Sequence, residues 1–165
     1  MTTIIRAALV AAAFLLSATA AGAHDTKLGD LVLSGQWVRA TAEGAPTSAG
    51  YLTIHNTGSE ADRLVSASTG ISGRTEIHTM TMDGGVMRMR PLGNGIEIPA
   101  GSTIALKPGG EHIMIMGLKA RIEDGAKVTI RLAFEKAGEI DLSFPASMKP
   151  GGQGHGGHNM KKATQ

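Results

Sequence analysis

Histidine and methionine gather in the middle of this chain, between residues 76 and 117. Six of the nine methionines and two of the six histidines lie there. The pattern His-x-Met-x-Met occurs twice, once from His78 to Met82 and once from His112 to Met116. An ordinary hydrophobic core does not require this arrangement, so these residues are the first candidates for chemistry.

The spacing predicts that each triplet faces one way on a β-strand. Successive side chains of a strand point to opposite faces, so residues two apart share a face. The run Asp83–Gly85 predicts a hairpin, because aspartate followed by glycine suits a two-residue turn. If the first two of these residues form the loop, His78 lies opposite Met89. The same loop places Met80 opposite Met87, and such partners have Cβ atoms roughly 4.5–5.5 Å apart.

Imidazole together with thioether favours a particular metal. Thioether sulfur is a soft, neutral donor that suits Cu(I), whereas zinc sites use thiolate, imidazole or carboxylate. A third strand that carries His112 and Met114 would close a Cu(I) site of two histidines and two methionines. Methionine is also a flexible core filler. The remaining methionines of the segment are therefore expected to pack around the site rather than to ligate: Met80, Met82, Met87 and Met116.

The composition excludes several classes of protein. The chain contains no cysteine, which excludes disulfides, thiol redox chemistry, a cysteine nucleophile and the thiolate ligand of a blue-copper centre. The formal net charge is only +2 and falls to +1 if a leader containing Arg6 is removed. Neither value indicates a nucleic-acid or membrane partner. No paired carboxylates or nucleophile–base spacing indicates an enzyme.

The first 23 residues have the pattern of a secretory signal peptide. Arg6 supplies the basic start, Ala7–Leu16 is a short apolar run, and Ala21–Ala23 is a cleavage site of the A-x-A type. Ala18–Ala20 is a competing site, and uncleaved anchoring is a further alternative. We expect export to the periplasm and no membrane insertion after cleavage, since the apolar run is too short to span a bilayer.

Cleavage after Ala23 would leave His24 as the first residue of a domain that covers residues 24–147. A terminal histidine can chelate copper through its amine and ring, as in oxidative copper enzymes, although a frayed terminus is the simpler reading. About ten short β-type segments separated by turn residues predict an all-β sandwich or barrel. The clearest are 31–39, 51–56, 62–68, 76–82, 96–98, 103–106, 127–135 and 139–144. Trp37 is expected in the core and His55 at an exposed or hydrogen-bonded strand position.

Residues 148–165 form a glycine-rich tail that is expected to be flexible. His155, His158 and Met160 lie in it. A short histidine and methionine tract of this kind indicates auxiliary binding of Cu(II) or Cu(I). The alternative is a solvated tail whose histidines are incidental.

The segment from residue 31 to 144 resembles the PCu(A)C-type periplasmic copper chaperone family. The resemblance rests on YLTIHNTG at 51–58, ADRLVSAS at 61–68, EIHTM at 76–80, GVMRMRP at 85–91, IEIPAG at 96–101 and LKPGGEHIMIMGL at 106–118. It implies a cupredoxin-like Greek-key β-sandwich. Carried over position by position, it implies that Cu(I) is held by His78, Met89, His112 and Met114.

The same resemblance implies delivery of copper to the centre of cytochrome c oxidase subunit II, with or without Sco-type proteins. A periplasmic copper-sequestering or resistance protein would use the same site and remains an alternative. A copper-dependent redox enzyme that uses His24 is a third possibility, and an electron-transfer protein is disfavoured by the lack of cysteine. We expect a monomer that is not an enzyme.

Overall fold

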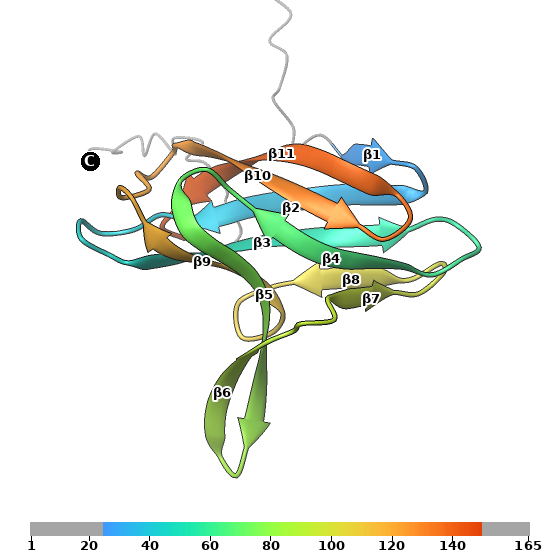
Figure 1. Ribbon diagram of the computed structural model, residues 1–165, viewed down its shortest axis with the longest axis horizontal. Coiled ribbons are helices and arrows are strands. Elements are labelled where there is room, and N and C mark those ends of the chain that lie inside the picture. Colours follow the sequence, from blue (N-terminus) through green and yellow to red (C-terminus); the bar gives the residue numbers. More distant parts are fainter. Residues whose placement is uncertain (1–24, 150–165) are drawn as a thin grey trace, which may run out of the picture.

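The computed structural model describes residues 25–149, and every regular element in that range is a β-strand (Figure 1). No helix in this range is long and apolar enough to cross a membrane. The eleven strands are β1 (Thr26–Leu28), β2 (Leu31–Arg39), β3 (Thr47–Asn56), β4 (Asp62–Ser68), β5 (Ser72–Asp83), β6 (Val86–Pro91), β7 (Ile96–Ile98), β8 (Thr103–Leu106), β9 (His112–Leu118), β10 (Lys127–Phe134) and β11 (Gly138–Ser147).

The strands form two layers that β11 joins. One layer has the order β6-β5-β9-β3-β2, with β8 beside β3 and β1 beside β2. The other layer has the order β11-β10-β4-β7. The end of β11 crosses to the first layer, where Ala146 and Ser147 pair in parallel with Val38 and Arg39 of β2. The predicted all-β sandwich is thus confirmed.

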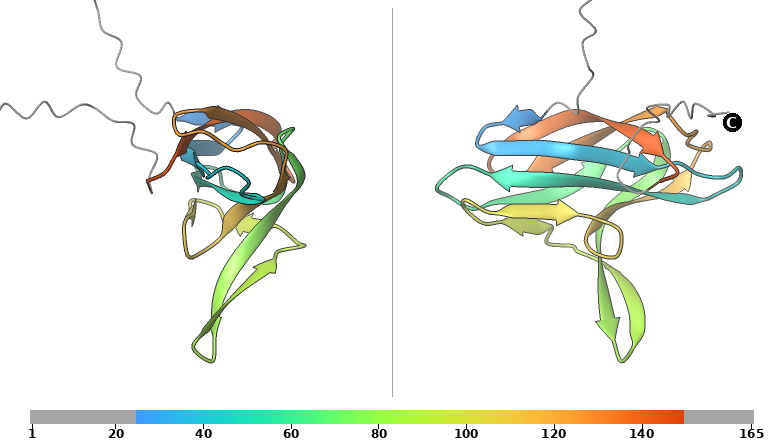
Figure 2. Two further views of the ribbon diagram at one scale, coloured as in Figure 1. Left: turned by 90° about the vertical axis from the view of Figure 1, so that its left-hand side faces the viewer. Right: turned by 180° about the vertical axis from the view of Figure 1, so that it is seen from behind.

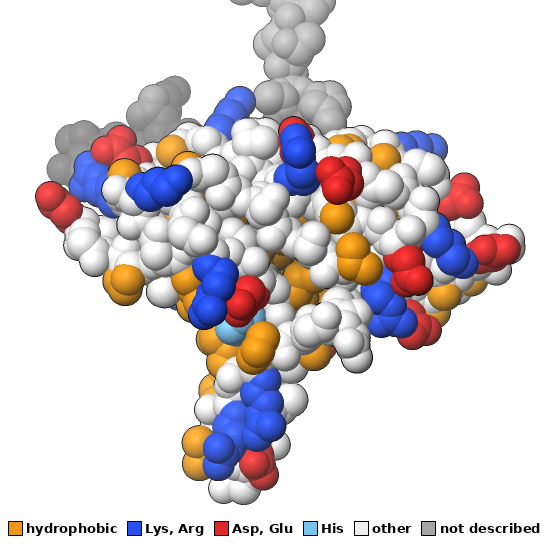
Figure 3. Space-filling view, viewed as in Figure 1, with side chains coloured by type: hydrophobic (Ala, Val, Ile, Leu, Met, Phe, Trp, Pro, Cys, Tyr) orange, Lys and Arg blue, Asp and Glu red, His pale blue; other side chains and the backbone are white. Residues whose placement is uncertain are grey.

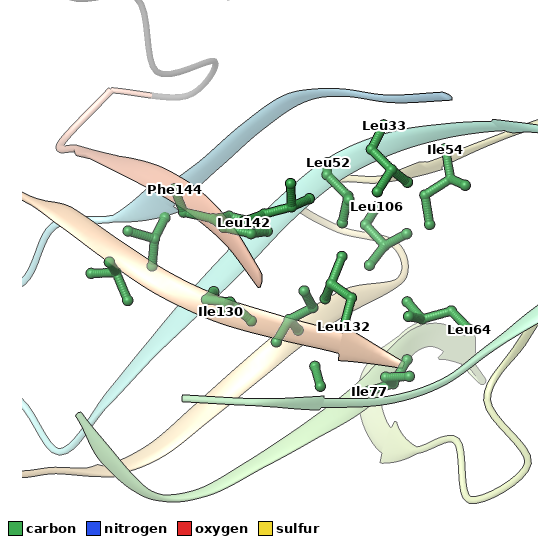
Figure 4. Packing of buried hydrophobic residues seen from close by; sticks show 14 of the residues in the cluster. Leu33, Leu52, Ile54, Leu64, Ile77, Leu106, Ile130, Leu132, Leu142 and Phe144 are labelled. Atoms are coloured by element: carbon green, nitrogen blue, oxygen red, sulfur yellow. The ribbon is translucent and has the colours of Figure 1, made fainter. Parts of the chain in front are cut away.

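The core lies between the layers and is mostly aliphatic (Figure 4). Alternation along the strands explains which residues enter it. In β10 every second residue from Val128 to Phe134 is buried, while most of the residues between them are exposed. Leu33 and Ile113 from the first layer belong to the same cluster as Phe144 from the second, and all three are fully buried. This packing makes a rigid support for side chains on the outer face of the first layer.

Several predicted strands have the observed bounds, namely 31–39, 62–68, 96–98 and 103–106. Two predictions were wrong. The strand predicted over 51–56 begins earlier, at Thr47, because Thr47–Gly50 pairs with β9. The strand predicted over 76–82 begins earlier, at Ser72, which pairs with Leu118 of β9. In both places small residues extend a strand because a distant partner supplies the hydrogen bonds.

The register of the β5–β6 hairpin differs from the predicted one by two residues. Gly84 and Gly85 form the loop, with φ angles of 56° and 82°, and Asp83 pairs with Val86. A tight turn of this type needs positive φ at both central positions, which two glycines adopt more readily than aspartate and glycine. Met80 therefore lies opposite Met89 rather than Met87, and Pro91 rather than Met89 lies opposite His78. The shift is even, so every residue keeps its predicted face.

The hairpin formed by β5 and β6 projects from the sandwich in all three views (Figures 1 and 2). Within residues 25–149, β6 pairs with β5 alone, and all six of its residues are exposed. The hairpin leaves the body just beyond the pair formed by β5 and β9. That junction is where the predicted ligands meet.

Gly95, which follows this hairpin in the chain, lies very close to the backbone of β4. Its φ is +68°, and a Cβ atom there would lie 2.1 Å from the carbonyl oxygen of Leu64. We expect Gly95→Ala to lower the free energy of unfolding by at least about 1–2 kcal/mol, the cost of left-handed backbone alone. Urea unfolding measures this loss. Gly93→Ala is the matched control, since nothing lies within 4 Å of its added Cβ, and an equal loss in both variants would contradict this account.

Candidate metal centre

Strands β5 and β9 place two of the predicted ligands face to face. His78 and His112 are directly opposite each other in the antiparallel pair, and their ring centroids lie 6.0 Å apart. Both residues are buried, with 8% and 3% of their surface exposed. They share the outer face of the layer, because Ile77 and Ile113 beside them point into the core. Two imidazoles so placed can converge on one ion.

The ring of His112 is oriented by the turn that precedes its strand. Its Nδ1 lies 2.9 Å from the carbonyl oxygen of Gly110. A carbonyl oxygen only accepts hydrogen bonds, so Nδ1 carries the proton and donates it. The neutral ring then presents the lone pair of Nε2. A backbone carbonyl that fixes the tautomer in this way is typical of metal-binding histidines.

The ring of His78 is oriented by Glu76, two residues earlier on the same face of β5. Its Nε2 donates to the Glu76 carboxylate over 2.9 Å, and Arg74 also contacts that carboxylate at 3.3 Å. The hydrogen bond from His78 holds the pKa of Glu76 below its usual range, with help from the charge of Arg74. Nδ1 of His78 is buried and has no hydrogen-bond partner among the described residues. An unpartnered lone pair costs free energy unless something binds it.

Glu76 is not among the predicted site residues, but its hydrogen bond with His78 makes it part of the site. The signal was present in the spacing, because residues i and i+2 of a strand lie on the same face. It was not decisive, because Glu97 and Glu111 also lie near β-type segments. Only the fold shows which carboxylate meets an imidazole.

The two predicted methionines lie on the same face as the histidines. Met114 follows His112 by two residues and pairs with Glu76, which makes it a diagonal neighbour of His78. Met89 pairs with Met80, so it too is diagonal to His78 rather than directly opposite. Diagonal neighbours across strands are about 7–8 Å apart, within reach of long side chains. Met114 is half-buried, whereas Met89 is 45% exposed.

Aromatic rings continue the row of imidazoles across the sheet. Tyr51 of β3 lies 6.4 Å from His112, and Trp37 of β2 stacks on Tyr51 with centroids 4.5 Å apart. Both aromatic residues are buried, as expected for Trp37. The row passes over four neighbouring strands and gives His112 an apolar side. A drier surrounding strengthens the interaction of a ligand with a cation.

The other histidine candidates fall elsewhere. His55 is tied by Nδ1 to the carbonyl oxygen of Ser102 and to the hydroxyl of Thr103, as expected of a hydrogen-bonded strand residue. His24 and the tail residues lie outside the described range: His155, His158 and Met160. Within residues 25–149 no three His, Cys, Asp or Glu side chains form a metal-binding group. The other soft donors on the face that carries the two imidazoles are methionine sulfurs.

The surface at this point is mixed in charge (Figure 3). Histidine surface is visible where the hairpin joins the body, beside acidic, basic and hydrophobic patches. The carboxylate of Glu76 contacts the ring of His78. The four predicted donors are neutral, and three of them are at least partly buried. Such a set suits a soft cation of low charge better than a hard divalent one.

Comparison with known proteins fits this arrangement. The family model described as "Putative lipoprotein LpqE-like" matches residues 31–146. The chain belongs to the LpqE-like family. A protein of Leifsonia xyli subsp. xyli, described as "Putative lipoprotein Lxx21020", is 35% identical to this LpqE-like protein over 152 residues. The match covers 87% of this chain and 90% of that one.

Solved structures confirm the resemblance to PCu(A)C-type domains. The apo PCuAC domain from PmoF1 is 28% identical, with a TM-score of 0.65, and the match covers 76% of this LpqE-like protein and all (100%) of that domain. The solution structure of CuI-DR1885 from Deinococcus radiodurans is 27% identical, with a TM-score of 0.60. That match covers 81% of this chain and 87% of the other.

Proposed function

We propose that this LpqE-like protein is a periplasmic copper chaperone that carries Cu(I) on His78, Met89, His112 and Met114. One observation carries the proposal. Two buried imidazoles face each other, and each has one nitrogen held by an oxygen acceptor. The other nitrogen of His78 is buried and has no hydrogen-bond partner within residues 25–149. Methionines flank them on the same face. The solved Cu(I) form of a protein 27% identical to this one supports the choice of metal.

The proposed ligands divide into a fixed group and a mobile one. His112 and His78 are buried and oriented by Gly110 and Glu76. Met89 lies on the exposed strand β6, and its long thioether side chain is free to swing. Soft ligands exchange readily when they are accessible. We therefore expect a thiol of the acceptor to replace Met89 first, with no change in the oxidation state of copper.

The proposed route begins with export and ends at an oxidase. The sequence of the first 23 residues supports secretion to the periplasm with removal of the leader. The expected acceptors are cytochrome c oxidase subunit II and Sco-type proteins. The tail residues His155, His158 and Met160 are proposed to bind further copper, as Cu(II) or Cu(I). This function is binding and transfer, without catalysis.

Transfer to an acceptor tests the chaperone function. The Cu(I)-loaded protein is mixed without oxygen with the soluble domain of cytochrome c oxidase subunit II, alone and with a Sco-type protein. We expect copper to move to the acceptor, as followed by metal content after separation. A strain without the gene should lose oxidase activity at low copper. Copper sensitivity with normal oxidase activity would instead support sequestration and overturn delivery.

Glu76 provides a test of how the site is oriented. Glu76→Ala removes the acceptor that fixes the ring of His78. We expect Cu(I) affinity to fall roughly 10–100-fold, the usual cost of losing an outer partner of a ligand. Competition with a Cu(I) chelator measures it. Glu97→Ala removes an exposed carboxylate of β7 that pairs with Arg63 of β4, and it should leave affinity unchanged. Equal affinities in both variants would rule out an orienting role.

A further inference from the structure

The projecting hairpin has two chemically different faces. One face carries two cross-strand pairs of methionine, Met80 opposite Met89 and Met82 opposite Met87. The other face carries polar pairs, in which Thr79 and Thr81 lie opposite Arg90 and Arg88. Asp83 forms an ion pair with Arg88 over 3.1 Å on that polar face. The hairpin is therefore amphipathic, and three of the four methionines on its methionine face are exposed.

These methionines are too exposed to be core residues. Met82 and Met87 are 68% and 53% exposed, and the whole of β6 is exposed. The exposed pair of Met82 and Met87 gains little from burial, and threonine would suit such strand positions better. The methionine face is also continuous with the candidate metal centre. His78, Met80 and Met82 lie in one row on the same face of β5, at a spacing of about 3.3 Å per residue.

We propose that Met82 and Met87, together with Met80, form a second and weaker Cu(I) site near the tip of the hairpin. This inference rests on the proposed function and extends it. Thioether sulfur is the soft neutral donor that Cu(I) accepts. Cross-strand partners have Cβ atoms about 4.5–5.5 Å apart, so two flexible side chains can hold one ion between them. Met80 adds a third sulfur from the neighbouring position.

The second site would pass copper to or from the main site by ligand exchange. Met80 and Met89 form the pair between the tip and His78. A Cu–S bond to Met89 forms as the bond to Met82 or Met87 breaks, and copper stays Cu(I) with no proton released. The tip site binds more weakly because it has no imidazole and lies in water. Copper is thus held tightly only at the buried end of the row.

The test uses the full chain with ¹³C-labelled methionine methyl groups and an anaerobic titration with Cu(I). The first equivalent should shift the methyl signals of Met89 and Met114. The second should shift those of Met82 and Met87. In the double variant that combines Met82→Ala and Met87→Ala, we expect the first equivalent of Cu(I) to bind with unchanged affinity. The rate of loading from a Cu(I)–chelator complex should fall several-fold.

Met148→Ala is the matched control, because Met148 is 64% exposed and lies on no methionine pair. It should change neither the second step nor the loading rate. The second site is overturned if the second equivalent moves only the signal of Met160, or if the double variant loads as fast as the control. If instead the first equivalent of Cu(I) does not shift the methyl signals of Met89 and Met114, the proposed main site is wrong. A hairpin tip that binds only a protein partner would show no shift of the Met82 and Met87 methyl signals at either equivalent of Cu(I), which would also overturn the second site.

Discussion

Replacing His112 by alanine is expected to abolish tight Cu(I) binding while leaving the fold intact. The loss should exceed the roughly 10–100-fold that follows removal of an outer partner of a ligand. His112 is the most buried of the proposed ligands and has its Nδ1 proton fixed by Gly110. No other imidazole among the described residues can take its place, since His55 is held elsewhere by Ser102 and Thr103.

Chelator competition measures the affinity of His112→Ala, and circular dichroism checks that the sandwich remains. His55→Ala is the matched control, because it also removes a strand histidine with a hydrogen-bonded ring. Affinity should be unchanged there. If His112→Ala and His55→Ala bind Cu(I) equally well, the metal lies elsewhere in the chain.

Phe144→Ala is expected to cause the largest loss of stability. Phe144 is fully buried, and it lies on β11, the strand that joins the two layers. Removing its ring costs the transfer free energy of the lost atoms and leaves a cavity, which together amount to about 3–5 kcal/mol. Denaturant unfolding of the metal-free protein measures the change.

Ser143→Ala controls for Phe144→Ala at the neighbouring position of the same strand. Ser143 is exposed and points away from the core, so its replacement should stay within about 0.5 kcal/mol. A loss below about 1 kcal/mol for Phe144→Ala would show that the layers do not pack against each other as described.

Most of the strands could be predicted because alternation and turn residues within each segment are enough to define them. Alternation in Lys127–Phe134 and turn residues around Ile96–Ile98 fix these elements without a partner. Strand β1 and the start of β3 could not be predicted in this way. Thr26–Leu28 is short and pairs only with β2, and Thr47–Gly50 is extended because β9 lies beside it. Pairing between distant segments decides such cases.

The faces on which the candidate ligands lie could be predicted from the sequence, but their register could not. Alternation put His78, Met80 and Met89 on one face, and the structure keeps that result. The turn of the β5–β6 hairpin could form at Asp83–Gly84 or at Gly84–Gly85. The structure uses the two glycines, which shifts every cross-strand partner by two positions. The position of His112 opposite His78 depends on the pairing of β5 with β9, which no local pattern contains.

X-ray absorption at the copper edge tests the central claim most directly. The full chain is loaded with one equivalent of Cu(I) without oxygen, and the neighbours of copper are counted. We predict two nitrogen and two sulfur neighbours, and the loss of one nitrogen in His78→Ala. A first shell of nitrogen and oxygen alone, or of sulfur alone, would contradict a site built from His78, Met89, His112 and Met114.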